Sequence, residues 1–114
     1  MTRISAGVDV SKNRSTVCII DQDGKFIMRP FLVWHSTEEL DFLADTLKRL
    51  NGEVRVIMES TSVYQYPIAL QLKERGLFIS IVNAYEMKQF ANIDFRGGKT
   101  DKKDSRTIAS YGIS

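Results

Sequence analysis

Residues 4–34 read ISAGVDVSKNRSTVCIIDQDGKFIMRPFLVW, and this stretch contains three extended runs separated by short polar segments. The Asp23-Gly24 pair is a turn signal. Pro30 lies inside the third run and favours a strand that is at a sheet edge or bent there, because proline donates no hydrogen bond to a ladder. The runs are rich in apolar and β-branched residues and predict three antiparallel strands at 4–10, 16–20 and 26–34.

The hydrophobic period changes after the third run. Ser36 and Glu39 form a capping box, and leucines follow at helical spacing until Asn51-Gly52 stops the helix. The short run 54–58 is almost wholly apolar, which is typical of a strand buried on both faces. The remaining expected elements are a helix over 37–50, a strand over 54–58, a helix over 64–75, a strand over 77–82, a short helix over 83–90 and a helix over 101–111 with Thr100 as N-cap.

The predicted order is β-β-β-α-β-α-β-α-α, which belongs to the α/β class. It describes a mixed five-stranded sheet with the antiparallel meander on one side and the parallel strands on the other. The ribonuclease H-like fold has this order. No repeat, low-complexity segment or interdomain linker interrupts the sequence, so residues 1–114 are expected to form one domain.

Composition excludes several classes of protein. The chain has 16 Lys or Arg against 14 Asp or Glu, with one cysteine, Cys18, and one histidine, His35. These are too few for an intramolecular disulfide or a structural zinc site. The sequence has no run of about 20 apolar residues and no apolar targeting segment, so we expect a cytoplasmic protein without a membrane partner.

Basic residues are concentrated near the C-terminus. Such a cluster predicts contact with phosphate, although a solvated helix face is the alternative. Lys12, directly after the first strand, is a further candidate, or an ordinary turn residue. The candidate nucleic-acid ligands are Lys12, Arg96, Lys99, Lys102, Lys103 and Arg106.

Four acidic residues are candidates for a metal site. Asp9 lies within an apolar strand and Glu59 follows another, so the two are neighbours if these strands pair. Asp101 and Asp104 are expected one turn apart on the last helix. Oxygen ligands without His or Cys select Mg²⁺ or Mn²⁺, and two such ions about 4 Å apart support attack on a phosphodiester.

Each acidic residue also has a structural interpretation. Asp9 could begin a turn, and Glu59, Asp101 and Asp104 could stabilise helix N-termini. The four together fit a metal site better. Among the other residues with reactive or aromatic side chains we expect Cys18 in the core and His35 in a surface loop. We expect Trp34, Tyr64 and Tyr85 in core or helix-face packing rather than as base-stacking platforms.

Four short motifs resemble the N-terminal domain of the DEDD insertion-sequence transposases. This family is related to the Piv DNA invertases, and its N-terminal domain is similar to the RuvC Holliday-junction resolvases. Ser62, Lys103 and Ser105 depart from the pattern, and none of them is an expected metal ligand. The motifs are GVDVSK at 7–12, MESTSVY at 58–64, KTDKKDS at 99–105 and IASY at 108–111.

The resemblance implies a DNA transposase or site-specific recombinase whose acidic tetrad binds a divalent metal for strand cleavage and exchange. It places that tetrad on Asp9, Glu59, Asp101 and Asp104. It further implies DNA as substrate, a serine-bearing C-terminal domain beyond residues 1–114, a guide RNA in part of the family, and a homo-oligomer of the full-length protein.

Other functions remain open from sequence alone. An actin-like or sugar-kinase ATPase also has an Asp on its first strand, but it needs a glycine in the following hairpin, and residues 11–15 contain none. A RuvC-like junction nuclease and a non-catalytic module for nucleic-acid binding or self-association are the remaining alternatives.

Overall fold

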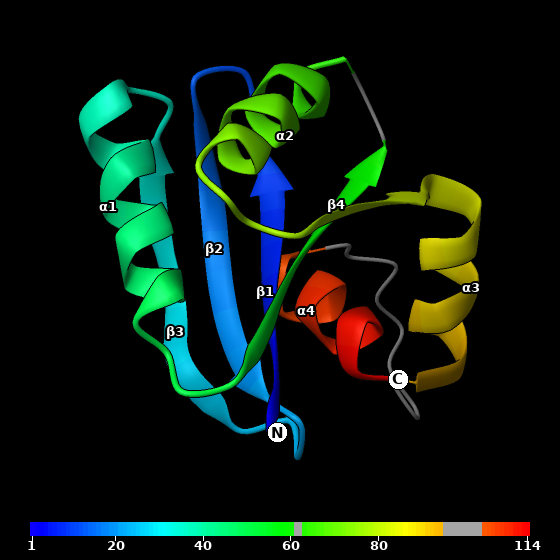
Figure 1. Cartoon of the computed structure of the whole chain (residues 1–114). Coiled ribbons are helices and arrows are strands. Elements are labelled where there is room, and N and C mark those ends of the chain that lie inside the picture. Colours follow the sequence, from blue (N-terminus) through cyan, green and yellow to red (C-terminus); the bar gives the residue numbers. More distant parts are fainter. Residues whose placement is uncertain (61–62, 95–103) are drawn as a thin grey trace.

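The computed structural model describes residues 1–60, 63–94 and 104–114, and its elements follow the predicted order (Figure 1). No helix in these three segments is both long and apolar enough to cross a membrane. The strands are β1 (Arg3–Val10), β2 (Arg14–Asp21), β3 (Phe26–Trp34), β4 (Glu53–Ser60) and β5 (Ile79–Asn83). The helices are α1 (Thr37–Lys48), α2 (Gln65–Glu74), α3 (Ala84–Asp94) and α4 (Ser105–Ile113).

The five strands form one mixed sheet in the order β3-β2-β1-β4-β5. β1 pairs antiparallel with β2 and parallel with β4, which confirms the predicted meander on one side and parallel strands on the other. β3 is an edge strand, as Pro30 indicated, and its pairing with β2 shifts register between Val17 and Ile20.

The sheet is covered on both faces, as Figure 1 shows. On one face α1 and α2 bury the largest apolar cluster, which includes Val8, Val17 and Met58 from the strands and Leu43 and Leu72 from the helices. On the other face α4 and α3 bury two smaller clusters. These contain Ile57, Val82, Met87 and Ile108, and Cys18, Ile20 and Ala109.

Helix α4 packs unusually close to β1 because β1 has small residues where the helix crosses it. A Cβ atom on Gly7 would lie 2.1 Å from the carbonyl oxygen of Ser105 and 2.3 Å from the amide nitrogen of Ala109. The buried Ser5 hydroxyl donates to the carbonyl oxygen of Ala109 at 2.6 Å. The contact therefore depends on the absence of a side chain at residue 7.

The start of the last helix differs from the prediction. α4 begins at Ser105, and Asp104 is its N-cap, with an extended ψ of 175° and a side chain that accepts from the Thr107 amide. The prediction of Thr100 as N-cap was wrong for α4, because aspartate at 104 caps the helix and its own backbone is not helical. Thr100 and Asp101 lie outside the described residues.

Several predicted packing roles also need correction. Trp34, Tyr64 and Tyr85 are exposed rather than core residues, with 47%, 42% and 69% of their surface accessible. His35 lies in the loop between β3 and α1, as expected, but it is half-buried, and its Nε2 is 2.8 Å from the buried Ser15 hydroxyl. Cys18 is buried in the core, as expected.

Candidate carboxylate site and nucleic-acid surface

Asp9 and Glu59 are placed side by side by the pairing of β1 with β4. The last paired residues are Val8 and Met58, and Asp9 and Glu59 follow them directly on the two strands. Both carboxylates lie on the α4 face, because Gly7 and Ile57, two residues earlier on each strand, contact that helix. Asp9 is exposed and Glu59 is buried. Two strands thus bring two acids to the carboxyl edge of the sheet.

A third acid, Asp104, reaches the same edge from α4. Partial desolvation, and then the negative charge of Asp104, raise the pKa of Asp9, although part of its surface remains exposed. The close crossing of α4 over Gly7 explains this proximity, because it holds the helix N-terminus against the end of β1. Asp104 Oδ1 accepts from the Thr107 amide at 3.0 Å, and this bond fixes the direction of the carboxylate. Asp9 and Asp104 therefore belong to one electrostatic site.

The chemistry of these donors fits a hard divalent cation. All three acids offer oxygen ligands, and the repulsion between Asp9 and Asp104 is the kind that a cation relieves. Within residues 1–60, 63–94 and 104–114, no group of three or more His, Cys, Asp or Glu side chains is close enough to hold a metal ion. Asp101, the fourth predicted ligand, lies outside these segments.

The neighbouring cysteine does not join the site as a thiolate. Burial raises the pKa of Cys18 to about 11, and the charge of Asp104 adds to this, while the Arg106 guanidinium opposes it. A thiol with this pKa is neutral at physiological pH, and the thiolate is the form that ligates metals or attacks substrates. The donor set at this edge is accordingly one of oxygen atoms.

Two of the predicted basic residues, Lys12 and Arg106, are described, and both are exposed. Lys12 is exposed in the β1–β2 turn, which the Ser11 amide closes by donating to the Arg14 carbonyl oxygen at 2.9 Å. Arg106 is exposed on the first turn of α4, two residues after Asp104. The other four predicted ligands of nucleic acid, Arg96, Lys99, Lys102 and Lys103, fall outside the described residues.

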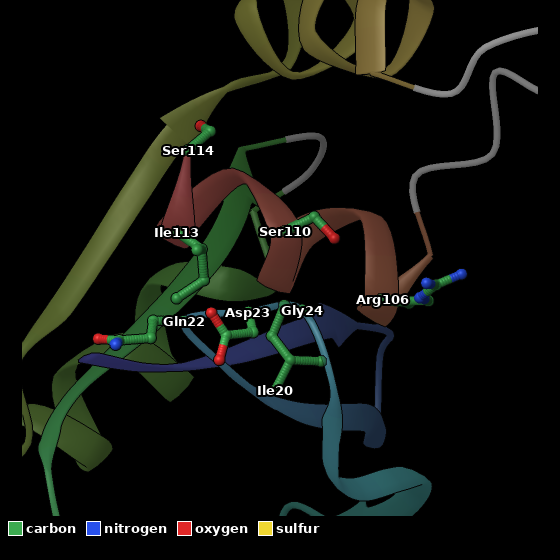
Figure 2. Close-up of a pocket in the computed structure, with 8 residues that line it drawn as sticks. All are labelled: Ile20, Gln22, Asp23, Gly24, Arg106, Ser110, Ile113 and Ser114. Carbon is green, nitrogen blue, oxygen red and sulfur yellow. The ribbon is translucent and has the colours of Figure 1, made fainter. Parts of the chain in front are cut away.

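A pocket of about 410 Å³ lies between α4 and the β2–β3 turn and is lined along the helix from Arg106 to Ser114. Figure 2 shows Ile20 and Asp23 beneath α4, while Arg106 stands at one end of the helix and points away from them. Arg106 is the one predicted site residue among those that line it. The lining residues are Ile20, Gln22, Asp23, Gly24, Arg106, Ser110, Ile113 and Ser114.

The sequence analysis missed three contacts between an arginine and an aromatic ring, which involve the rings of Phe26 and Trp34. Arg29 and Arg106 approach the ring of Phe26, with their Cζ atoms 4.7 and 5.4 Å from its centroid. Arg14 lies over Trp34, 5.4 Å from the ring centroid. The third extended run was visible in the sequence, but the register that places Trp34 opposite Arg14 and Phe26 opposite Ile20 depends on strand pairing.

Comparison with solved structures finds this architecture in Thermus thermophilus RuvC, with a TM-score of 0.60 and 16% identity over 93% of this chain and 90% of that chain. T. thermophilus RuvC in complex with a Holliday junction substrate gives a TM-score of 0.57 and 15% identity over 94% and 90% of the two chains. The fold is therefore of the RuvC-like, ribonuclease H-like class.

The family follows from the sequence itself. A search of curated proteins found no match. The profile of the DEDD transposases of the IS110 type, described as "Transposase", matches residues 6–114. The chain belongs to this transposase family, as the motifs at 7–12, 58–64 and 99–105 indicated.

Proposed function

We propose that this chain is the metal-dependent catalytic domain of its transposase, acting in cleavage and exchange of DNA strands. The observation that supports this most is the electrostatic coupling of Asp104 to Asp9, beside the strand pairing that puts Glu59 at the same edge of the sheet as Asp9. Asp101 completes the proposed tetrad, three residues before Asp104.

The proposed cofactor is Mg²⁺ or Mn²⁺. When bound, such ions would supply activation of an attacking hydroxyl and stabilisation of a leaving phosphodiester oxygen. In this proposal Asp9 and Glu59 present oxygen ligands from the rigid sheet. Asp104 has a double role in this proposal, because one carboxylate oxygen also accepts from the Thr107 amide and caps α4. Cys18, which is buried opposite Gly7, has a neutral thiol that would not compete for the metal.

The proposed substrate is DNA. Lys12, in the turn that follows β1, and Arg106, on the first turn of α4, are both exposed and are the described cations that would meet DNA phosphates. Arg96, Lys99, Lys102 and Lys103 extend this set in the sequence. The RuvC structure with a Holliday junction substrate supports DNA as partner for this fold.

Three further features of the proposal rest on the family alone. They are a second domain with a nucleophilic serine, a guide RNA that selects the target, and assembly of the full-length protein into a homo-oligomer. Residues 1–114 are then the N-terminal catalytic portion, which provides the metal site but not the serine.

The metal site is tested by calorimetric titration of Mn²⁺ into the chain and two variants. We expect saturable binding to the parent chain, and at least tenfold weaker binding to Asp9→Asn. The control is Asp45→Asn, since Asp45 is exposed on α1, on the opposite face of the sheet. Equal binding to all three proteins would refute the site.

A further inference from the structure

A row of side chains crosses the α4 face of the sheet at the level of the carboxylates. Asp9 pairs with Thr16 on β2, and Thr16 pairs with Leu32 on β3. The next pair on this face, toward the β1–β2 turn, is Arg14 with Trp34. Leu32 and Trp34 therefore continue the surface that begins at Glu59 and Asp9.

The end of this row is open to solvent. Leu32 is 54% exposed and Trp34 is 47% exposed, whereas Val33 between them is buried against α1 on the opposite face, 2% exposed. With strands about 4.8 Å apart and residues about 3.3 Å apart along them, the Trp34 backbone lies roughly 12 Å from that of Asp9. This is a distance of only a few nucleotides along a nucleic-acid strand.

The backbone beneath Trp34 is held from both sides. Its amide donates to Glu39 Oε1 at 3.0 Å, so the capping-box glutamate of α1 also anchors the end of β3. The next amide, of His35, donates to the carbonyl oxygen of Asn13 at 3.0 Å, and the His35 ring bonds Ser15. A ring on a fixed backbone loses little conformational entropy when it stacks on a ligand.

The charge beside the ring is positive. Arg14 Cζ lies 5.4 Å from the Trp34 ring centroid, and Lys12 is exposed in the adjoining turn. Aromatic rings combined with cations are the recurring surface for single strands, in which bases stack and phosphates meet the cations. A second copy of the chain adding a strand to this edge is disfavoured, because Pro30 interrupts the amides of β3.

We propose that Trp34, together with Arg14, forms a stacking platform for an unpaired base of the DNA strand that is processed at the carboxylates. This inference rests on the proposed function, because it assumes that DNA lies along the row from Glu59 to Leu32. Trp34 stacks on the base, Arg14 meets the adjoining phosphate, and Leu32 supports the neighbouring sugar or base. The platform would hold an unpaired DNA strand close to the metal site.

Trp34 can report on its own contact, because it is the one tryptophan of the chain. A short single-stranded oligothymidylate is titrated into the protein with Mg²⁺ present, and tryptophan fluorescence and the anisotropy of a labelled oligonucleotide are followed. We expect saturable quenching with the same midpoint as the anisotropy change. Trp34→Ala is expected to weaken binding about tenfold, and Trp34→Tyr to restore most of the affinity.

The matched control is Phe78→Ala. Phe78 is 60% exposed and lies under Arg55, 5.0 Å from its Cζ, but it precedes β5 at the end of the sheet away from the carboxylates. This variant should bind as the parent does. Circular dichroism of Trp34→Ala checks that the fold is kept, and quenching of the parent chain tests the contact without any substitution.

Three results would overturn the platform. They are DNA binding with no change in Trp34 fluorescence, equal weakening by Phe78→Ala, and Trp34-dependent binding of oligouridylate without binding of oligothymidylate. If Asp9→Asn abolishes Mn²⁺ binding but Trp34→Ala binds DNA as tightly as the parent chain, the platform is refuted and the proposed function stands. If the parent chain binds neither DNA nor Mn²⁺, both the platform and the proposed function are refuted.

Discussion

The carboxylate of Asp104, at the N-terminus of α4, raises the pKa of the Asp9 carboxylate at the end of β1, in addition to the larger effect of burial. Two residues 95 positions apart in sequence thus share one electrostatic environment. The cause is the glycine contact between β1 and α4, which brings the helix N-terminus to the strand end.

This coupling predicts the effect of removing one charge. Asp104→Asn should lower the pKa of Asp9, because the repulsive neighbour is gone. It should also raise the stability of the metal-free chain above the pKa of Asp9, where the native state otherwise holds both charges. Carboxyl carbon NMR titration measures the first effect and thermal unfolding with a chelator measures the second. An unchanged pKa of Asp9 would contradict the coupling.

The cap and the charge of Asp104 can be separated. Asparagine still accepts from the Thr107 amide, whereas alanine does not, so Asp104→Ala is expected to lose about 1 kcal/mol of unfolding free energy that Asp104→Asn keeps. Both variants should weaken Mn²⁺ binding. Urea denaturation distinguishes the two roles, and equal stability of the Ala and Asn variants would argue against the cap.

Gly7 is predicted to control the position of α4. Gly7→Ala places a methyl group within 2.3 Å of backbone atoms of the helix, so the helix must move, and we expect a loss of about 3 kcal/mol and weaker metal binding. Gly24→Ala is the comparison. Gly24 has φ of 82° with no atom near a Cβ, so the cost there is only the backbone strain of about 1 kcal/mol, with metal binding retained. A harmless Gly7→Ala would show that the close crossing is not required.

His35 predicts a loss of stability in acid. Burial lowers its pKa below the ordinary 6.5, and a hydrogen bond that the ring donates to the backbone of Lys12 opposes this. The native state therefore takes up a proton less readily than the unfolded chain does. The contribution of neutral His35 to the free energy of unfolding should be fully present above about pH 6.5. It should decrease as the pH falls from 6.5 toward the lowered pKa of the native state. His35→Asn should reduce this dependence in urea denaturation, and an identical pH profile would refute the assignment.

The order of elements was predictable because each had a local signal. The Asp23-Gly24 turn, the Ser36 cap and the apolar run 54–58 marked a hairpin, a helix and a central strand, and the structure contains all three. The predicted start of α4 was wrong because Thr100 and Asp104 are both residue types that favour the N-cap position, and the sequence alone does not choose between them.

The site was predictable only in part. Asp9 and Glu59 followed from the expected pairing of their strands, and β1 does pair with β4. Trp34 was assigned to packing because an aromatic residue in a strand is usually buried. Trp34 is exposed because β3 is an edge strand and because α4 does not cover this part of the sheet. Both features belong to the tertiary structure.

The most direct test of the proposed metal site is paramagnetic broadening of backbone amide resonances by Mn²⁺ at substoichiometric concentration. The proposal predicts that amides near Asp9, Glu59 and Asp104 broaden first and together, and that this is lost in Asp9→Asn. Broadening centred on other acids, such as Asp21 and Asp23 in the β2–β3 turn, or spread evenly over the surface, would contradict a shared metal site.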